Sequence, residues 1–155
     1  MKLLRIYVDT SVIGGCFDKE FAEWSIALME DFRDRRFQCV VSDVTAAEVA
    51  MAPDAIQDLF EELLSRSERL EVTRSALELL SAYESHAILG PRFRNDMLHI
   101  AIATVSEVDV VVSWNFKHIV RLDKIRLFNA VSLELGYRTL SIYSPREVAT
   151  HGREE

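Results

Sequence analysis

Four polar side chains interrupt apolar stretches of this sequence and could do chemistry together. They are Asp9, Glu48, Asp96 and Asn115. Carboxylate and amide oxygens are the ligands that Mg²⁺ and Mn²⁺ prefer in proteins. Clustered carboxylates repel and raise one another's pKa values unless a cation lies among them. A divalent ion held by such groups can activate water and neutralise the charge that develops on a phosphate.

Each of these residues also has an ordinary structural interpretation. Asp9 follows an apolar run and fits the N-cap of a helix, and Asp96 fits the cap of a later helix. Glu48 fits a solvated helix position, and Asn115 fits a turn. Taken one at a time, the structural interpretations are favoured. Only a fold that brings all of them together favours a metal site.

The segments around these residues alternate between predicted strands and predicted helices. Strands are expected at 3–8, 37–41, 70–72, 108–112 and 140–143. Helices are expected at 19–35, 43–51, 54–66, 74–89, 97–105, 123–135 and from 144 onward. Gly14-Gly15 indicates a loop after the first strand. The alternation predicts an α/β fold, a three-layer α/β/α sandwich around a mainly parallel five-stranded sheet.

The first predicted strand organises the fold and the candidate site. Its apolar residues, Leu3-Leu4 and Ile6-Tyr7-Val8, are typical of a central strand buried on both faces. Ligands of open parallel sheets bind beyond the carboxyl ends of the strands, where the strand order reverses. Asp9 lies at such an end. If the first and fourth strands are neighbours, the four polar side chains converge at this edge.

Composition narrows the class of protein. At 155 residues with 49% hydrophobic residues, the chain predicts one globular domain over 1–150 and a loose tail at 151–155. The net charge of −7 argues against general electrostatic binding of nucleic acid. The charge is uneven, because residues 1–90 carry 9 basic and 17 acidic side chains, and residues 91–155 carry 9 and 8. A polyanion is expected to approach the second part.

Cysteine usage and hydropathy favour a cytoplasmic protein. Cys16 and Cys39 match no zinc spacing with the four histidines, and a reduced compartment fits them. Asp9 interrupts the first apolar run too early for a signal peptide. No apolar run reaches the roughly 18 residues that a membrane-spanning helix needs, so no membrane association is expected.

Four segments, in order, resemble PIN domains of the ribonuclease kind that serve as VapC-like toxins in toxin–antitoxin pairs. They are Tyr7-Val8-Asp9-Thr10-Ser11, Ala46-Ala47-Glu48-Val49, Asn95-Asp96-Met97-Leu98-His99-Ile100-Ala101 and Val111-Val112-Ser113-Trp114-Asn115-Phe116-Lys117-His118-Ile119. Residues 125–136 and 144–148 also resemble a subset of these proteins. The likeness covers nearly the whole chain.

The resemblance implies roles for individual residues. Asp9, Glu48 and Asp96 match the acidic positions that hold the divalent metal, and Asn115 matches a fourth position that is Asp in many members. Ser113 matches a Ser or Thr near the same site. The implied activity is a Mg²⁺- or Mn²⁺-dependent endoribonuclease, in which metal-activated water attacks a phosphodiester in line. The implied partners are single-stranded or structured RNA, a cognate antitoxin and a second copy in a homodimer.

Residues flanking the motifs leave alternatives open. Arg92, Arg94 and Lys117 fit either substrate phosphate contacts or ordinary surface charges. Trp114 fits packing better than base stacking. His99 lies one helical turn after Asp96 and fits a buried core histidine better than a site-facing one.

Two other classes of protein compete with the nuclease hypothesis. Asn115 and the net charge of −7 favour a degenerate PIN scaffold that binds RNA or protein without cleaving it. An unrelated doubly wound domain, such as a nucleotide binder or a phosphotransfer receiver, is the other. The sequence contains no G-x-G-x-x-G or G-x-x-x-x-G-K-[ST], which counts against nucleotide binding. Only Asp9 precedes Thr10, whereas a receiver needs an acidic pair ahead of its phosphorylated Asp.

Overall fold

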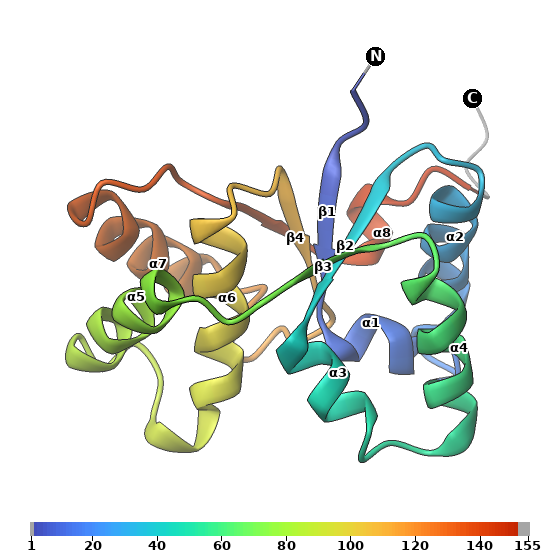
Figure 1. Ribbon diagram of the computed structural model, residues 1–155, viewed down its shortest axis with the longest axis horizontal. Helices are drawn as coiled ribbons and strands as arrows, with labels where there is room; N and C mark the ends of the chain where they lie inside the picture. Colours follow the sequence, from blue (N-terminus) through green and yellow to red (C-terminus); the bar gives the residue numbers. More distant parts are fainter. Residues whose placement is uncertain (1, 152–155) are drawn as a thin grey trace.

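Five parallel strands form one sheet in the computed structural model, which describes residues 2–151 (Figure 1). They are β1 (Arg5–Val8), β2 (Gln38–Ser42), β3 (Glu68–Leu70), β4 (Val110–Val112) and β5 (Ser141–Tyr143). Their order is β3-β2-β1-β4-β5, and every pairing is parallel. The predicted three-layer α/β/α fold is confirmed, with a wholly parallel sheet.

Helices cover both faces of this sheet (Figure 1). One face packs against α5 (Arg74–Ser85), α6 (Arg94–Val105) and α7 (Leu122–Glu134). The other packs against α1 (Thr10–Gly15), α2 (Ala22–Arg33), α4 (Asp54–Leu64) and α8 (Pro145–Val148). Helix α3 (Asp43–Val49) follows β2 directly, and the short 3₁₀ helix η1 (Pro91–Phe93) precedes α6.

Strand β1 is central and buried on both faces, as its apolar run predicts. Tyr7 belongs to the core under α5, α6 and α7, whereas Ile6 and Val8 belong to the core on the other face. The chain moves outward from β1 to β3 and then returns to the other side of β1 at β4. The strand order therefore reverses between β1 and β4. The carboxyl ends of these two strands border the place where open α/β sheets bind ligands.

Two local predictions differ from the structure. Gly14-Gly15 is not a loop, because both residues lie in α1. The third strand lies at Glu68–Leu70, two residues earlier than expected. The rest of the predicted tail, residues 152–155, lies outside the described residues.

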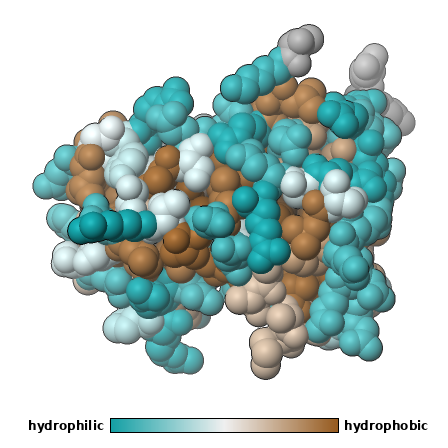
Figure 2. Space-filling model, viewed as in Figure 1, coloured by the Kyte–Doolittle hydropathy of each residue, from teal (hydrophilic) through white to brown (hydrophobic). Residues whose placement is uncertain are grey.

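The surface of the protein carries both hydrophilic and hydrophobic side chains. Figure 2 shows hydrophilic side chains over most of one face and hydrophobic ones gathered toward its middle. Within residues 2–151, no helix combines the length and apolarity needed to cross a membrane.

Candidate metal centre at the carboxyl edge of the sheet

Asp9 directly follows β1 and is nearly completely buried, with 5% of its surface exposed. It occupies the N-cap position of α1, but its side chain makes no capping hydrogen bond. Instead, Oδ1 accepts a hydrogen bond from Ser11 Oγ at 2.5 Å and Oδ2 accepts one from Ser113 Oγ at 2.6 Å. Burial raises the pKa of Asp9, and the charge of Asp96 adds to this rise, although His99 and the two hydroxyls oppose it. Asp9 is therefore the N-cap residue of α1, as one interpretation predicted, but its carboxylate does not form the capping bond.

A chain of hydrogen bonds leads from Asp9 to Asp96. Ser113 Oγ, which donates to Asp9, accepts from the backbone N of Asn115 at 2.9 Å. The Asn115 amide Nδ2 donates to Asp96 Oδ2 at 3.3 Å, and His118 Nδ1 lies 3.1 Å from the same oxygen. Asp96 lies in the first turn of α6 and is not its N-cap. Asn115 Oδ1 accepts from the His118 backbone N at 2.9 Å, so this residue also shapes a turn.

Glu48 approaches from α3 and has different partners. Its Oε1 accepts from Thr10 Oγ1 at 2.8 Å and lies 2.6 Å from His99 Nε2. Burial alone raises the pKa of Glu48, but the hydrogen bond and charge of His99, with the Thr10 hydroxyl, lower it overall. His99 Nδ1 lies 2.5 Å from the Tyr7 hydroxyl, which lies 2.7 Å from Ser42 Oγ. His99 is thus both a buried core residue and a contact of the site.

The donor types at this edge fit a hydrated Mg²⁺ or Mn²⁺, since they are carboxylate and amide oxygens around a buried negative charge. Within residues 2–151, however, no three acidic, histidine or cysteine side chains are arranged to hold a metal ion. One oxygen of each of two candidate ligands has a histidine partner, because Glu48 Oε1 lies 2.6 Å from His99 Nε2 and Asp96 Oδ2 lies 3.1 Å from His118 Nδ1.

Comparisons with solved structures find the same fold at low sequence identity. VapBC2 from Rickettsia felis, bound to a DNA fragment from its promoter, matches with a TM-score of 0.59 and 14% identity over 91% of this chain and 98% of that one. FitAcB from Neisseria gonorrhoeae matches with a TM-score of 0.55 and 16% identity over 92% and 99%. FitAB bound to an IR36 DNA fragment gives 0.55 and 17% over 94% and 99%. The chain has a PIN-like fold. No protein-family model and no curated protein matches the sequence.

Around the acidic residues of this PIN-like fold, the flanking side chains have distinct surroundings. Arg94 lies 3.8 Å from Glu84 in an exposed ion pair, whereas Lys117 is exposed beside His118. Trp114 is buried and stacks on Phe21 with ring centroids 4.4 Å apart, which confirms the packing interpretation. Sequence reasoning gave no role to His118. Its position three residues after Asn115 was the available signal.

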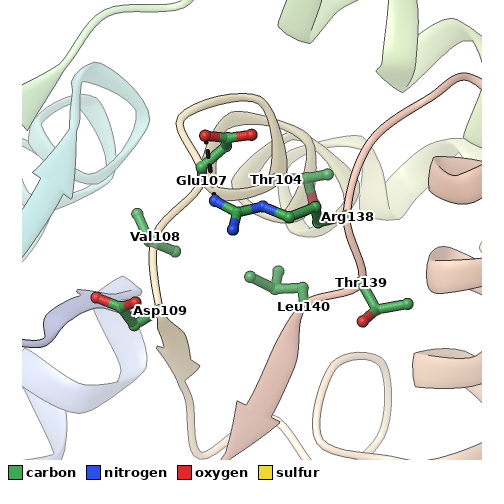
Figure 3. Close-up of a pocket in the computed structure, with 7 residues that line it drawn as sticks. All are labelled: Thr104, Glu107, Val108, Asp109, Arg138, Thr139 and Leu140. Atoms are coloured by element: carbon green, nitrogen blue, oxygen red, sulfur yellow. Dashed lines mark ion pairs between the residues drawn. The ribbon is translucent and has the colours of Figure 1, made fainter.

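A cavity of about 230 Å³ lies at the opposite edge of the PIN-like sheet (Figure 3). It is lined by residues at the amino ends of β4 and β5 and contains none of the predicted site residues. Arg138 and Glu107 form an ion pair of 3.2 Å there, and both side chains are largely exposed. Exposed pairs of this kind add little stability, and this hollow is not the candidate site.

Replacing Tyr7 by Phe tests the hydrogen-bond chain behind Glu48. The change removes a buried hydroxyl with two partners, Ser42 and His99, and is expected to cost about 1–2 kcal/mol in the free energy of unfolding. Urea denaturation measures this cost. Tyr83→Phe is the matched control, since its buried hydroxyl shares a hydrogen bond of 2.7 Å with Ser132 and has no contact with the site residues named above. Only Tyr7→Phe is expected to weaken Mn²⁺ binding as well, and an equal effect of both variants on Mn²⁺ affinity contradicts the prediction.

Proposed function

We propose that this protein is a Mg²⁺- or Mn²⁺-dependent endoribonuclease that hydrolyses phosphodiester bonds of RNA. The observation that carries the proposal is the buried Asp9 carboxylate at the point where strand order reverses, linked through Ser113 and Asn115 to Asp96. A buried carboxylate is costly unless a cation balances it. A bound divalent ion would supply an activated water and neutralise the charge developing on the phosphate.

The proposed roles follow from the hydrogen bonds of each residue. Asp9 and Asp96 are the direct ligands, and Glu48 either binds the ion or orients the attacking water. Ser113 holds Asp9 by its hydroxyl, and Asn115 fixes Asp96 through its amide. Asn115 is neutral and so brings one negative charge fewer than an Asp would. This favours a site for a single tightly held ion.

The partners are proposed from the comparisons. The solved structures with this fold include VapBC2 and FitAB, both bound to DNA fragments, and FitAcB. We extend the toxin hypothesis to this chain, with a cognate antitoxin over the acidic edge, a homodimeric assembly and a cytoplasmic location.

A second candidate function is RNA or protein binding without cleavage. The observation that favours it is the contact of Glu48 with His99 and of Asp96 with His118, which gives one oxygen of each carboxylate a partner other than a metal ion. The Asn115 carbonyl oxygen is also engaged, by the His118 backbone. A scaffold of this kind needs no metal ion.

Titration of the purified wild-type chain with Mn²⁺, followed by cleavage of end-labelled single-stranded RNA, separates the two functions. The nuclease is expected to bind Mn²⁺, to cut within the RNA, to stop in EDTA and to recover when Mn²⁺ is restored. A chain that binds no Mn²⁺ and leaves the RNA intact is not a nuclease. RNA binding without cleavage supports the scaffold instead.

A further inference from the structure

A second hollow adjoins the candidate metal centre on the side of His118. It has a volume of about 340 Å³ and lies between the segment that joins α5 to α6 and the segment that leads into α7. We call it the basic groove, and its side chains that matter here are Phe93, Lys117, His118, Arg121 and Lys124.

The basic groove concentrates positive charge in a chain whose net charge is −7. All of its ionisable side chains are basic: Lys117, His118, Arg121 and Lys124. Lys124 Nζ donates to the Ile88 carbonyl at 2.8 Å, which joins the two walls. Arg121 pairs with Asp123 at 2.8 Å, but both side chains are about half exposed and the pair is weak. Lys117 is exposed and available to an anion.

The basic groove is continuous with the acidic edge through one histidine. The His118 ring lies 3.1 Å from Asp96 by its Nδ1 atom and packs on Phe93 with ring centroids 3.8 Å apart. His118 and Phe93 therefore border the basic groove on the side of Asp96, and Lys117 and Arg121 also line it. Cations beside an aromatic ring are a combination that binds single strands, where phosphates contact the cations and an unpaired base stacks on the ring.

We infer that the basic groove binds one nucleotide of a single-stranded RNA beside the bond to be cut, with its phosphate on Lys117 and Arg121 and its base against Phe93. The inference rests on the proposed ribonuclease function and adds to it a binding groove for one nucleotide next to the candidate metal centre. The cavity volume of about 340 Å³ lies at the lower end of the range of roughly 300–1,000 Å³ for small-ligand pockets, which suits one nucleotide. A duplex keeps its bases paired and stacked inside, so it cannot present one to Phe93.

Fluorescence anisotropy of a labelled single-stranded RNA of about eight nucleotides tests the inference, in EDTA so that no cleavage occurs. The double variant Lys117→Gln/Arg121→Gln is expected to bind about tenfold more weakly at 0.1 M salt. The slope of its plot of log affinity against log salt concentration should be shallower by about 1.4, because each of the two lost phosphate contacts reduces the slope by about 0.7. Phe93→Leu should lose at least about fivefold in affinity with little change of slope.

The control variant is Arg74→Gln/Arg138→Gln, which removes two exposed cations outside the basic groove and changes the net charge equally. It is expected to bind the RNA like the wild type. Equal affinities of the groove and control variants overturn the inference, as does a wild-type chain that binds no RNA. Equally tight binding of a duplex RNA, or of polyglutamate, with the same dependence on Lys117 and Arg121 also overturns it. Circular dichroism of each variant confirms that it is folded.

The failures of the two proposals remain distinguishable. RNA binding is measured without a divalent ion, so it does not depend on catalysis. If RNA affinity depends on Lys117 but Mn²⁺ produces no cleavage, the basic groove is supported and only the ribonuclease proposal is contradicted. Conversely, the Lys117→Gln/Arg121→Gln variant could cleave RNA with Mn²⁺ and bind it with unchanged affinity. That result contradicts only the proposed role of the basic groove.

Discussion

The substitution Asp9→Asn is expected to stabilise the fold, to abolish Mn²⁺ binding and to reduce RNA cleavage at least about a hundredfold. Loss of a residue that only hydrogen-bonds to a metal ligand already lowers metal affinity or activity about 10–100-fold, and Asp9 is proposed as a ligand itself. The carboxylate is buried and its pKa is raised by that burial, so its negative charge opposes folding at neutral pH. Asn removes the charge. Ser11 and Ser113 can satisfy the new amide, because each hydroxyl both donates and accepts. A gain of about 0.5–2 kcal/mol in the free energy of unfolding is expected, typical of sites where function costs stability.

The pH dependence of this gain has a definite sign. The folded chain holds the Asp9 proton more tightly than the unfolded chain, so ionisation of Asp9 lowers stability as pH rises through the raised pKa. The difference in stability between Asp9→Asn and the wild type is therefore largest at neutral pH. It is expected to shrink as pH falls through that raised pKa, and to vanish below the usual Asp value of about 3.9. Urea denaturation at several pH values measures it.

Asp31→Asn is the matched control for a buried aspartate with no part in the site. Asp31 is fully buried, but its oxygens accept hydrogen bonds from the Thr150 backbone N, at 2.7 Å, and from the Thr150 hydroxyl. An Asn there can still accept from the Thr150 backbone N and donate to the Thr150 hydroxyl, but both bonds lose the assistance of the negative charge. The variant should therefore lose about 1 kcal/mol and keep its Mn²⁺ affinity. An Asp9→Asn protein that is destabilised like Asp31→Asn, or that still binds Mn²⁺, contradicts the proposed role of Asp9.

The fold could be predicted because its signals are local. The apolar run before Asp9 is long enough to mark a strand buried on both faces, and its central place in the sheet is confirmed. Ser42 marks the start of α3 by a capping box with Thr45, a signal contained within four residues. The shift of the third strand reflects its short length and exposed edge position, where hydrophobic alternation is weak.

The partners within the candidate site could not be predicted, because they depend on side chains far apart in sequence. Glu48 was expected either in solvent or on a metal, whereas its bond to His99 joins residues of two helices. Likewise, the bond of His118 to Asp96 depends on how the segment after β4 folds back on α6. Spacing along the chain brought the acidic residues to one edge of the sheet. It contained no information on which histidine each carboxylate would meet.

The two glycines that were predicted to form a loop, Gly14 and Gly15, have different packing within α1. Gly15→Ala should therefore lower the free energy of unfolding by about 1–2 kcal/mol, whereas Gly14→Ala should be neutral or stabilising. A Cβ atom on Gly15 would lie 2.6 Å from Ser25 Oγ and 2.9 Å from Trp114 Nε1. These two atoms share a hydrogen bond of 2.7 Å. Overpacking of this kind costs about 1–3 kcal/mol, partly offset by the better helix propensity of Ala.

Gly14 supplies the matched control within the same helix. A Cβ atom there would lie 3.7 Å from Ile56 Cδ1, which is an ordinary contact, so only the gain of about 0.5–1 kcal/mol from Ala in a helix remains. Gly15→Ala should also weaken Mn²⁺ binding, since the Trp114 backbone N donates to Ser11 Oγ at 3.0 Å and that hydroxyl holds Asp9. Urea denaturation and Mn²⁺ titration of both variants test this. If Gly15→Ala matches Gly14→Ala in both measurements, close packing of Trp114 on α1 does not position the site. If only Gly15→Ala loses stability and metal affinity together, the glycine is required because it lets Trp114 approach α1, and through Ser11 that approach places the Asp9 carboxylate.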